Sequence, residues 1–262
     1  MNSVNKTLYI PLYGKAYVSE RGLFLSDRKA EQIWAAEGFS LRGKAKSKWL
    51  AFYMGIRAAV FDEWVRQKLE QEPDAVVLHI GCGMDSRALR TGTKGHRWYD
   101  VDFPEVIGER KRYYSETDDY RMIPGDVRER DWLAAIPESK SAVVVMEGVS
   151  MYLTRGERNA FMENLCGHFG RIVLLMDCYT SLAARVSKYR NPINDVGVTE
   201  VFGVDHPEEM QQGGLVYLRE HEMMPRKYTG QLHGMQRYLF RKLYAGSVSQ
   251  RLYRLFEYQK TQ

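Results

Sequence analysis

The fold is decided by residues 74–102, which read DAVVLHIGCGMDSRALRTGTKGHRWYDVD. A short apolar run at residues 75–80 opens this stretch, with the length and β-branched content of a buried strand. A glycine turn follows at residues 81–86, and its end is predicted to begin a helix. A second short strand at residues 97–101 leads to Asp102. Strand, glycine turn, helix start, strand and acid form the first half of a nucleotide-binding βαβ unit.

The residue types in this stretch indicate which ligand it binds. Gly81 and Gly83 allow the backbone to turn sharply and to approach a ligand closely. Asp102 lies roughly 20 residues beyond them, where such units carry the acid that accepts both hydroxyls of a ribose. A dinucleotide site needs a third glycine where this chain has Ser86, and Asp85 in the turn serves a pyrophosphate poorly. The turn therefore favours a cofactor without phosphate, such as S-adenosylmethionine, over NAD.

Short apolar strands followed by acids recur further along the chain. Three more strands are predicted at residues 120–123, 141–146 and 171–176. The acids that follow them are Asp126, Glu147 and Asp177. Five such strands separated by helical segments predict a Rossmann-like, doubly wound and mostly parallel α/β sheet. Because ligands of these sheets bind outside the carboxyl ends of the strands, the acids are predicted to share one site.

The remaining segments are predicted to complete a single domain, residues 1–262. A helical cover is expected at residues 1–72 and a cofactor-binding core at residues 73–178. An insertion at residues 179–213 is expected to act as a lid on the pocket. Residues 214–262 are expected to form two final strands, at 215–218 and 236–244, and then a C-terminal helix at 250–262.

Composition narrows the class of protein. Among 262 residues, 44% are hydrophobic and 27% are charged, which is ordinary for a soluble globular protein. The three cysteines include no C-x-x-C pair, so a zinc site and a disulfide framework are not expected, and the cytoplasm is the expected compartment. No metal is expected. No apolar run is long enough to cross a bilayer, and no membrane partner is expected.

The net charge of +5 does not by itself indicate a nucleic-acid partner. Basic residues near the C-terminus alternate with tyrosines, a pattern that can bind RNA. We favour a solvated basic surface, and an RNA-modifying enzyme stays open as an alternative.

Four motifs carry a family resemblance. They are HIGCGMDSR at 79–87, YDVDFPEV at 99–106, GDVR at 125–128 and EGVSMYL at 147–153. In this order and spacing they resemble the leucine carboxyl methyltransferase family, which includes protein phosphatase methyltransferases and bacterial polyketide O-methyltransferases of the tetracenomycin type. The resemblance implies a fold of the class I S-adenosylmethionine methyltransferase type.

The resemblance also implies roles for individual residues. Gly81 and Gly83 would line the cofactor turn, and Asp102 would hold the ribose hydroxyls. The adenine would contact Asp126 and the backbone of Val127. The methionine part would lie near Glu147, Arg57 and Lys6, the last two matching residues that bind the cofactor carboxylate. Arg57 also lies within an apolar helical pattern, where an arginine needs an anionic partner.

The expected activity is O-methylation of a small molecule, with Tyr152, Tyr179 and Asp177 near the acceptor. A hydroxyl acceptor usually needs a base, whereas a carboxylate is already ionised at neutral pH. The predicted strand ends carry no histidine, although His206 could reach the pocket from the insertion, so a carboxylate is slightly favoured. Methylation of a protein C-terminal carboxylate and a non-catalytic cofactor-binding protein remain alternatives. The oligomeric state is left open.

Overall fold

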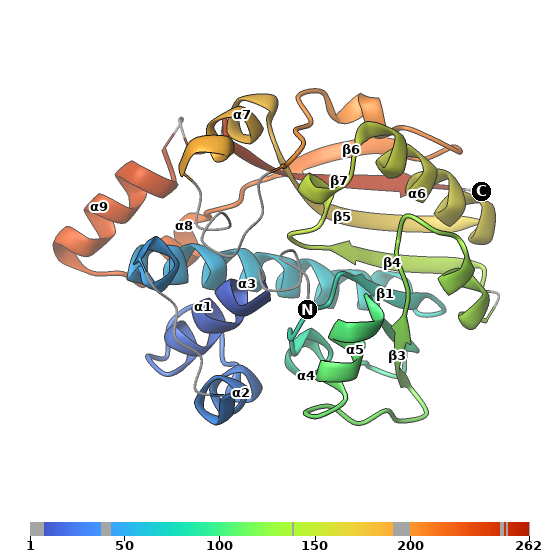
Figure 1. Ribbon diagram of the computed structural model, residues 1–262, viewed down its shortest axis with the longest axis horizontal. Coiled ribbons are helices and arrows are strands. Elements are labelled where there is room, and N and C mark those ends of the chain that lie inside the picture. The colour runs from blue at the N-terminus through green and yellow to red at the C-terminus, as the bar shows by residue number, and fades with distance from the viewer. Residues whose placement is uncertain are drawn as a thin grey trace.

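A computed structural model describes residues 8–37, 43–137, 139–190, 200–246, 249 and 251–261. The described chain forms an α/β fold around one seven-stranded sheet with the strand order β3-β2-β1-β4-β5-β7-β6 (Figure 1). The five parallel strands are β1 (Val76–Ile80), β2 (Trp98–Asp102), β3 (Tyr120–Pro124), β4 (Ser141–Met146) and β5 (Arg171–Tyr179). They agree with the five strands predicted from the sequence, and the predicted fold class is confirmed.

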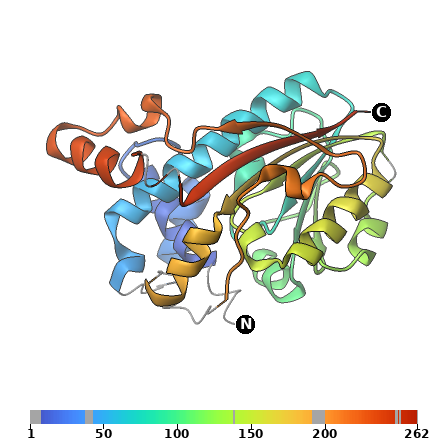
Figure 2. The same cartoon turned by 90° about the horizontal axis from the view of Figure 1, so that it is seen from above.

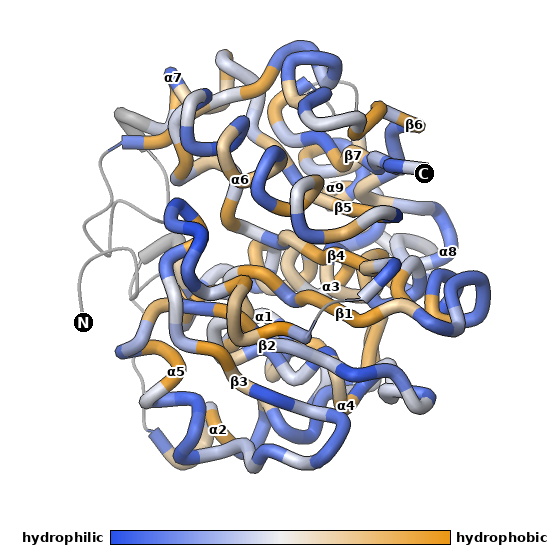
Figure 3. Tube along the Cα trace, turned by 90° about the vertical axis from the view of Figure 1, so that its right-hand side faces the viewer, coloured by the Kyte–Doolittle hydropathy of each residue, from blue (hydrophilic) through white to orange (hydrophobic). Residues whose placement is uncertain are grey.

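The middle of the sheet is buried on both faces. β1 pairs with β2 on one side and β4 on the other, and all five of its residues are buried. Its alternate side chains enter two cores, Val77 on the face of the N-terminal helices and Leu78 on the opposite face. Two-sided burial explains why these strands are almost continuously apolar, as the colouring of β1, β4 and β5 shows (Figure 3).

Helices cover both faces of the sheet (Figures 1 and 2). One face carries α3 (Lys48–Gln71), which begins after Ser47, whose hydroxyl accepts the Trp49 N–H. The other face carries α6 (Arg155–His168), which begins with a capping box formed by Thr154 and Glu157. Shorter helices connect the strands. They are α4 (Arg87–Thr91), α5 (Pro104–Arg110), η3 (Asp131–Ala135) and η4 (Ser150–Tyr152).

The N-terminal cover consists of α1 (Tyr9–Ser19) and α2 (Arg28–Glu37), which pack with α3. Close contact between α1 and α3 requires a small residue at Gly55, where an added Cβ would lie 2.6 Å from Val18 Cγ2. This contact holds α1 beside the carboxyl ends of the parallel strands.

The C-terminal elements differ from the sequence prediction. β6 (Val216–His221) overlaps a predicted strand, but residues 236–244, also predicted as a strand, belong to helix α9 (Gly234–Tyr244). The predicted C-terminal helix is instead strand β7 (Tyr253–Lys260), which lies antiparallel between β5 and β6. The alternating tyrosines and basic residues of this segment are compatible with either a helix or a strand. Residues 253–260 form a strand because they pair with β5 and β6, which are distant in sequence.

Four further helical segments complete the described chain: α7 (Ser181–Arg190), η6 (Pro207–Met210), α8 (Arg226–Thr229) and η2 (Gly43–Lys46). The first two belong to the segment predicted as a lid. Because residues 191–199 of that segment lie outside the described residues, its function as a lid stays a prediction.

Candidate active site

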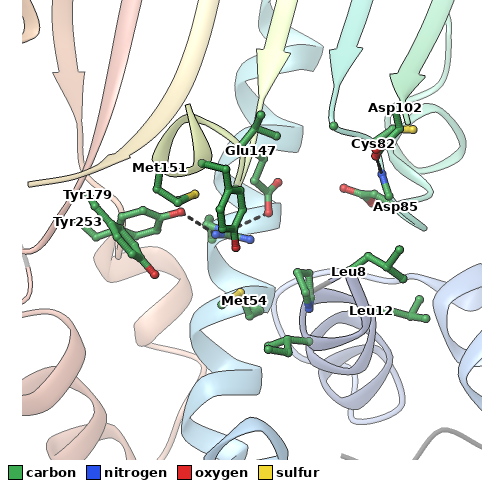
Figure 4. Close-up of a pocket in the computed structure, with 18 of the residues that line it drawn as sticks. Leu8, Leu12, Met54, Cys82, Asp85, Asp102, Glu147, Met151, Tyr179 and Tyr253 are labelled. Carbon is green, nitrogen blue, oxygen red and sulfur yellow. Dashed lines mark hydrogen bonds and ion pairs between the residues drawn. The ribbon is translucent and has the colours of Figure 1, made fainter. Parts of the chain in front are cut away.

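A cavity of about 690 Å³ lies at the carboxyl ends of the parallel strands. Leu8, which directly precedes α1, and Leu12 of α1 line the wall that faces the strand ends (Figure 4). Figure 4 shows Asp102 at one end of the cavity, Tyr179 at the other and Glu147 between them. We refer to these two regions as the glycine-turn end and the tyrosine end.

The glycine-turn end is shaped by the backbone after β1. Gly81 and Gly83 have φ angles of +65° and +50°, a region that favours glycine over other residues. A Cβ added at Gly81 would also lie 2.2 Å from Val149 Cγ2. Both conformation and space therefore require glycine at position 81, and the turn brings peptide groups to the cavity wall.

Asp102, at the end of β2, lines the cavity beside this turn. Its carboxylate accepts the Gly83 N–H at 2.7 Å and the Phe103 N–H at 2.8 Å, one bond on each oxygen. Each oxygen retains a free lone pair, so the oriented carboxylate can accept two hydroxyl donors. Burial raises the pKa of Asp102. From the other side, Arg110 donates to the Gly83 carbonyl at 2.9 Å, so the backbone of Gly83 is held between two charged groups.

Asp126 and Val127 line the same end of the cavity after β3. The Asp126 carboxylate accepts hydrogen bonds from the backbone and side chain of Arg128, with Nε at 2.9 Å. Burial opposes ionisation of Asp126, but these hydrogen bonds lower its pKa overall. The chain thus places a carboxylate and an apolar side chain side by side beyond Asp102.

Arg57 joins three strands beneath the middle of the cavity. It projects from α3 and is 4% exposed. Its Nε donates to Glu147 at 2.9 Å, and its Nη1 donates to Tyr253 at 2.8 Å and to Asp177 at 3.3 Å. The anionic partner expected for this buried arginine is therefore present within the protein as two carboxylates, while its predicted contact with a cofactor carboxylate stays a prediction.

A chain of buried ion pairs continues from Glu147 to the N-terminal cover. Glu147 pairs with Arg87, and Arg87 lies 3.2 Å from Asp85. The ammonium group of Lys15, on α1, lies 3.4 Å from Asp85. Both Lys15 and Asp85 line the cavity, so α1 contributes a buried cation to the site. The two arginines beside Glu147 lower its pKa to about 2, although burial opposes this shift.

The tyrosine end has an aromatic wall. The ring centroids of Tyr179 and Tyr253 are 4.9 Å apart, those of Tyr253 and Tyr53 6.1 Å, and those of Tyr53 and Tyr244 5.9 Å. All four tyrosines line the cavity, together with Tyr152. Burial raises the pKa of Tyr53, Tyr244 and Tyr253, which keeps these hydroxyls protonated at neutral pH.

The structure brings most of the predicted site residues to this one cavity. Its lining includes Arg57, Gly81, Gly83, Asp102, Asp126, Val127, Glu147, Tyr152 and Tyr179. Asp177 does not line it, because β5 extends two residues beyond Asp177 and the side chain is fully buried against Arg57 and Tyr253. His206 is exposed and is not part of the lining. Lys6 lies outside the described residues.

Comparison with known proteins identifies the family to which this chain belongs. A family model for leucine carboxyl methyltransferase matches residues 6–166. The chain belongs to this family. The membership predicted from the four motifs is thereby confirmed.

Two proteins that are named as methyltransferases are similar in sequence to this chain. The tetracenomycin polyketide synthesis O-methyltransferase TcmP of Streptomyces glaucescens is 36% identical over 157 residues, which span 60% of this chain but only 58% of TcmP. The S-adenosyl-L-methionine-dependent methyltransferase dpfgK of Gibberella zeae is 27% identical over 236 residues, 80% of this chain and 78% of the relative.

Solved structures agree in fold. Magnesium protoporphyrin IX methyltransferase of Synechocystis PCC 6803, with bound SAH, superposes with a TM-score of 0.53 at 13% identity, over 88% of this chain and 93% of the other. The N-methyltransferase NodS of Bradyrhizobium japonicum WM9 gives a TM-score of 0.52 at 12% identity, over 80% and 88% of the two chains. Both likenesses support the predicted class of α/β sheet.

Sequence reasoning missed Lys15 as a residue of the cavity. Its signal is weak, because Pro11 and Gly14 interrupt the helical pattern of the surrounding residues 8–19, LYIPLYGKAYVS. A lysine that is the single charge in a helical stretch of this kind is typical of a buried cation with an acidic partner. Here the partner, Asp85, comes from the glycine turn 70 residues later.

Proposed function

We propose that this protein is an S-adenosylmethionine-dependent O-methyltransferase whose acceptor is the carboxylate of a small, flat, apolar molecule. One observation carries the proposal. A single cavity of about 690 Å³ joins a glycine turn and the oriented carboxylate of Asp102 to an aromatic compartment. Membership of a methyltransferase family and the names of TcmP and dpfgK support it.

The residues of the glycine-turn end fit the proposed cofactor. Asp102 would accept the two ribose hydroxyls, and Asp126 with Val127 would flank the adenine. Lys15 and Arg57 are the buried cations available to its carboxylate, and Glu147 is the acid available to its ammonium group. NAD fits less well, because Ser86 replaces the third glycine and Asp85 points a carboxylate at the turn.

A thermal-shift measurement tests this assignment without an acceptor. S-adenosylmethionine should raise the melting temperature of the purified protein in a concentration-dependent way, whereas NAD at the same concentration should not. Lys15→Met should weaken binding of S-adenosylmethionine more than binding of adenosine, which has no carboxylate. Stabilisation by NAD alone would contradict the proposal.

In the reaction, the acceptor oxygen forms a bond to the methyl carbon while the carbon–sulfur bond breaks and the sulfur keeps its electron pair. The bound cofactor supplies an electrophilic methyl group, so the protein's contribution is alignment and exclusion of water. The tyrosine end can do both. Its rings present flat apolar faces to the acceptor, and α1 closes the opposite wall.

We propose a carboxylate acceptor because the side chains at the tyrosine end are poorly suited to act as a general base. The one histidine among the described lining residues of the cavity, His79, belongs to β1, where its Nδ1 lies 3.1 Å from Asp100, and Glu147 is held by Arg57 and Arg87. Asp177 is buried behind the wall, and burial keeps Tyr53 and Tyr253 protonated. A carboxylate acceptor needs no base, because it is already ionised at neutral pH.

A matched acceptor panel tests this choice. Fused-ring aromatic carboxylic acids would be compared with the corresponding phenols and carboxamides, with isotopically labelled S-adenosylmethionine and detection by mass spectrometry. We expect methyl transfer to acids and none to the amides. Transfer confined to phenols would contradict the carboxylate assignment while leaving the cofactor assignment intact.

A further inference from the structure

The exposed apolar side chains of this protein are concentrated on two helices. Nine large hydrophobic residues are exposed in the described chain, and six of them lie on α7 or α9. We call these six the α7–α9 patch: Leu182, Val186, Met235, Tyr238, Leu239 and Leu243. The two helices lie apart in Figures 1 and 2, but each contributes one of these residues, Val186 or Leu243, to the lining of the cavity. Exposed apolar residues that border a ligand cavity mark an interaction site, whereas scattered ones need no explanation.

On α9 the exposed apolar residues follow helical spacing. Met235, Tyr238, Leu239 and Leu243 occupy positions i, i+3, i+4 and i+8, which share one face. Met235 is 70% exposed, whereas Phe240, on the inner face, is fully buried. α9 is therefore anchored by one face and presents an apolar stripe on the other. In two perpendicular views α9 forms one end of the molecule (Figures 1 and 2).

The charged residues on α7 and α9 all have one sign. Neither α7 nor α9 contains an aspartate or a glutamate. Their exposed basic residues include Arg185, Arg237, Arg241 and Lys242, and none of these pairs with a carboxylate of the described residues. Two copies of such a surface would repel each other, so self-association through this patch is disfavoured. The complementary partner is anionic and has an apolar layer.

We propose that the α7–α9 patch binds the surface of an anionic lipid bilayer. Basic residues beside an apolar stripe on a protruding helix are the features of helices that lie in the membrane interface. No described helix has the length and apolar character needed to cross a membrane, so the contact is peripheral. This inference replaces the expectation from sequence that no membrane is involved, which considered spanning segments alone.

The patch continues into the mouth of the cavity. Val186 and Leu243 belong to the patch and also line the tyrosine end. A bilayer held against α7 and α9 would thus face the entrance for the acceptor. If the proposed function holds, an apolar acceptor dissolved in lipid would reach the tyrosine end without crossing water. Lipid binding itself does not depend on that function.

Co-sedimentation with vesicles tests the charge requirement. The unmodified protein should sediment with vesicles of phosphatidylcholine and phosphatidylglycerol, and much less with phosphatidylcholine alone. Each basic residue at an anionic surface is worth about a five-fold change in partitioning, so Arg237→Gln/Arg241→Gln should lower it about 25-fold. The matched control, Arg97→Gln/Lys111→Gln, removes two exposed charges elsewhere and should change partitioning little.

A second pair of variants tests the apolar stripe. Met235→Ser/Leu239→Ser should reduce vesicle binding at least ten-fold, whereas Leu89→Ser/Leu218→Ser, at exposed positions outside the patch, should not. All four variants should keep the circular-dichroism spectrum and the melting temperature of the ligand-free unmodified protein, which report folding. Absence of vesicle binding by the unmodified protein, equal binding to both lipid mixtures, or a dimer that dissociates in Met235→Ser/Leu239→Ser would overturn the proposal. None of these results would affect the proposed function.

Discussion

Replacing Arg57 by methionine should destabilise the protein strongly, because Arg57 compensates two buried carboxylates. Methionine keeps most of the apolar stem and removes the charge. Glu147 would retain Arg87, but Asp177 would be left with only Tyr253 and the Gly148 N–H. Removing one partner of a buried ion pair costs about 3–5 kcal/mol. Since only Asp177 loses its cation completely, we expect one such cost and not two.

The pH dependence of this loss provides a second signature. Burial raises the pKa of Asp177 even with Arg57 present, and removing Arg57 should raise it further. A carboxyl group whose pKa is higher in the folded than in the unfolded state destabilises the protein at high pH and loses this penalty as the pH falls. The deficit of Arg57→Met relative to the unmodified protein should therefore shrink between pH 7 and pH 5. Arg57→Met/Asp177→Asn should recover much of the loss at pH 7.

Urea unfolding followed by circular dichroism measures these free energies. Arg66→Met, an exposed arginine on the same helix, is the matched control and should change the free energy of unfolding by no more than about 0.5 kcal/mol. A loss below about 1 kcal/mol for Arg57→Met, or a deficit that grows towards pH 5, would refute the role given to Arg57.

Three further predictions concern the glycine-turn end and the charges beneath it. Asp102→Ala should leave the melting temperature of the ligand-free protein nearly unchanged and weaken S-adenosylmethionine by about 1.5–3 kcal/mol for each ribose hydrogen bond, measured by calorimetry; unchanged affinity would remove Asp102 from the site. Gly81→Ala should cost about 2–5 kcal/mol in urea unfolding, because the positive φ and the contact with Val149 both oppose a Cβ, whereas Gly108→Ala within α5 should be neutral or stabilising. Because the pKa of Glu147 is lowered to about 2, its contribution to stability should be complete above about pH 5 and disappear as the pH falls towards 2, a slope that Glu147→Gln should reduce.

The parallel half of the fold could be predicted from sequence because its signals are local. The central strands β1 and β4 are short apolar runs, and the runs are apolar because both faces of the sheet are covered. The glycine turn and Asp102 could be predicted for the same reason. The turn follows from the backbone freedom of Gly81 and Gly83, and Asp102 follows from its spacing after them. Asp102 lines the cavity, where the order of the strands places it beside Gly83.

The C-terminal half could not be predicted in this way because its pattern depends on distant partners. β7 contains Glu257, which is fully buried and looks incompatible with an interior strand. Its charge is compensated by Lys68 at 2.8 Å and by Arg219 at 2.7 Å, and His221 lies 2.6 Å from the same carboxylate. Arg219 and His221 come from the neighbouring strand β6. Lys15 was missed for a similar reason, since its partner Asp85 belongs to another element.

The chemical form of the transferred methyl group tests the central claim most directly. The purified protein would be incubated with a metabolite extract and methyl-labelled S-adenosylmethionine, and the labelled product treated with mild base. A methyl ester of a carboxylate should release the label as volatile methanol, which is the result we predict. A base-stable label, as in a methyl ether, would contradict the assignment of a carboxylate acceptor to the tyrosine end.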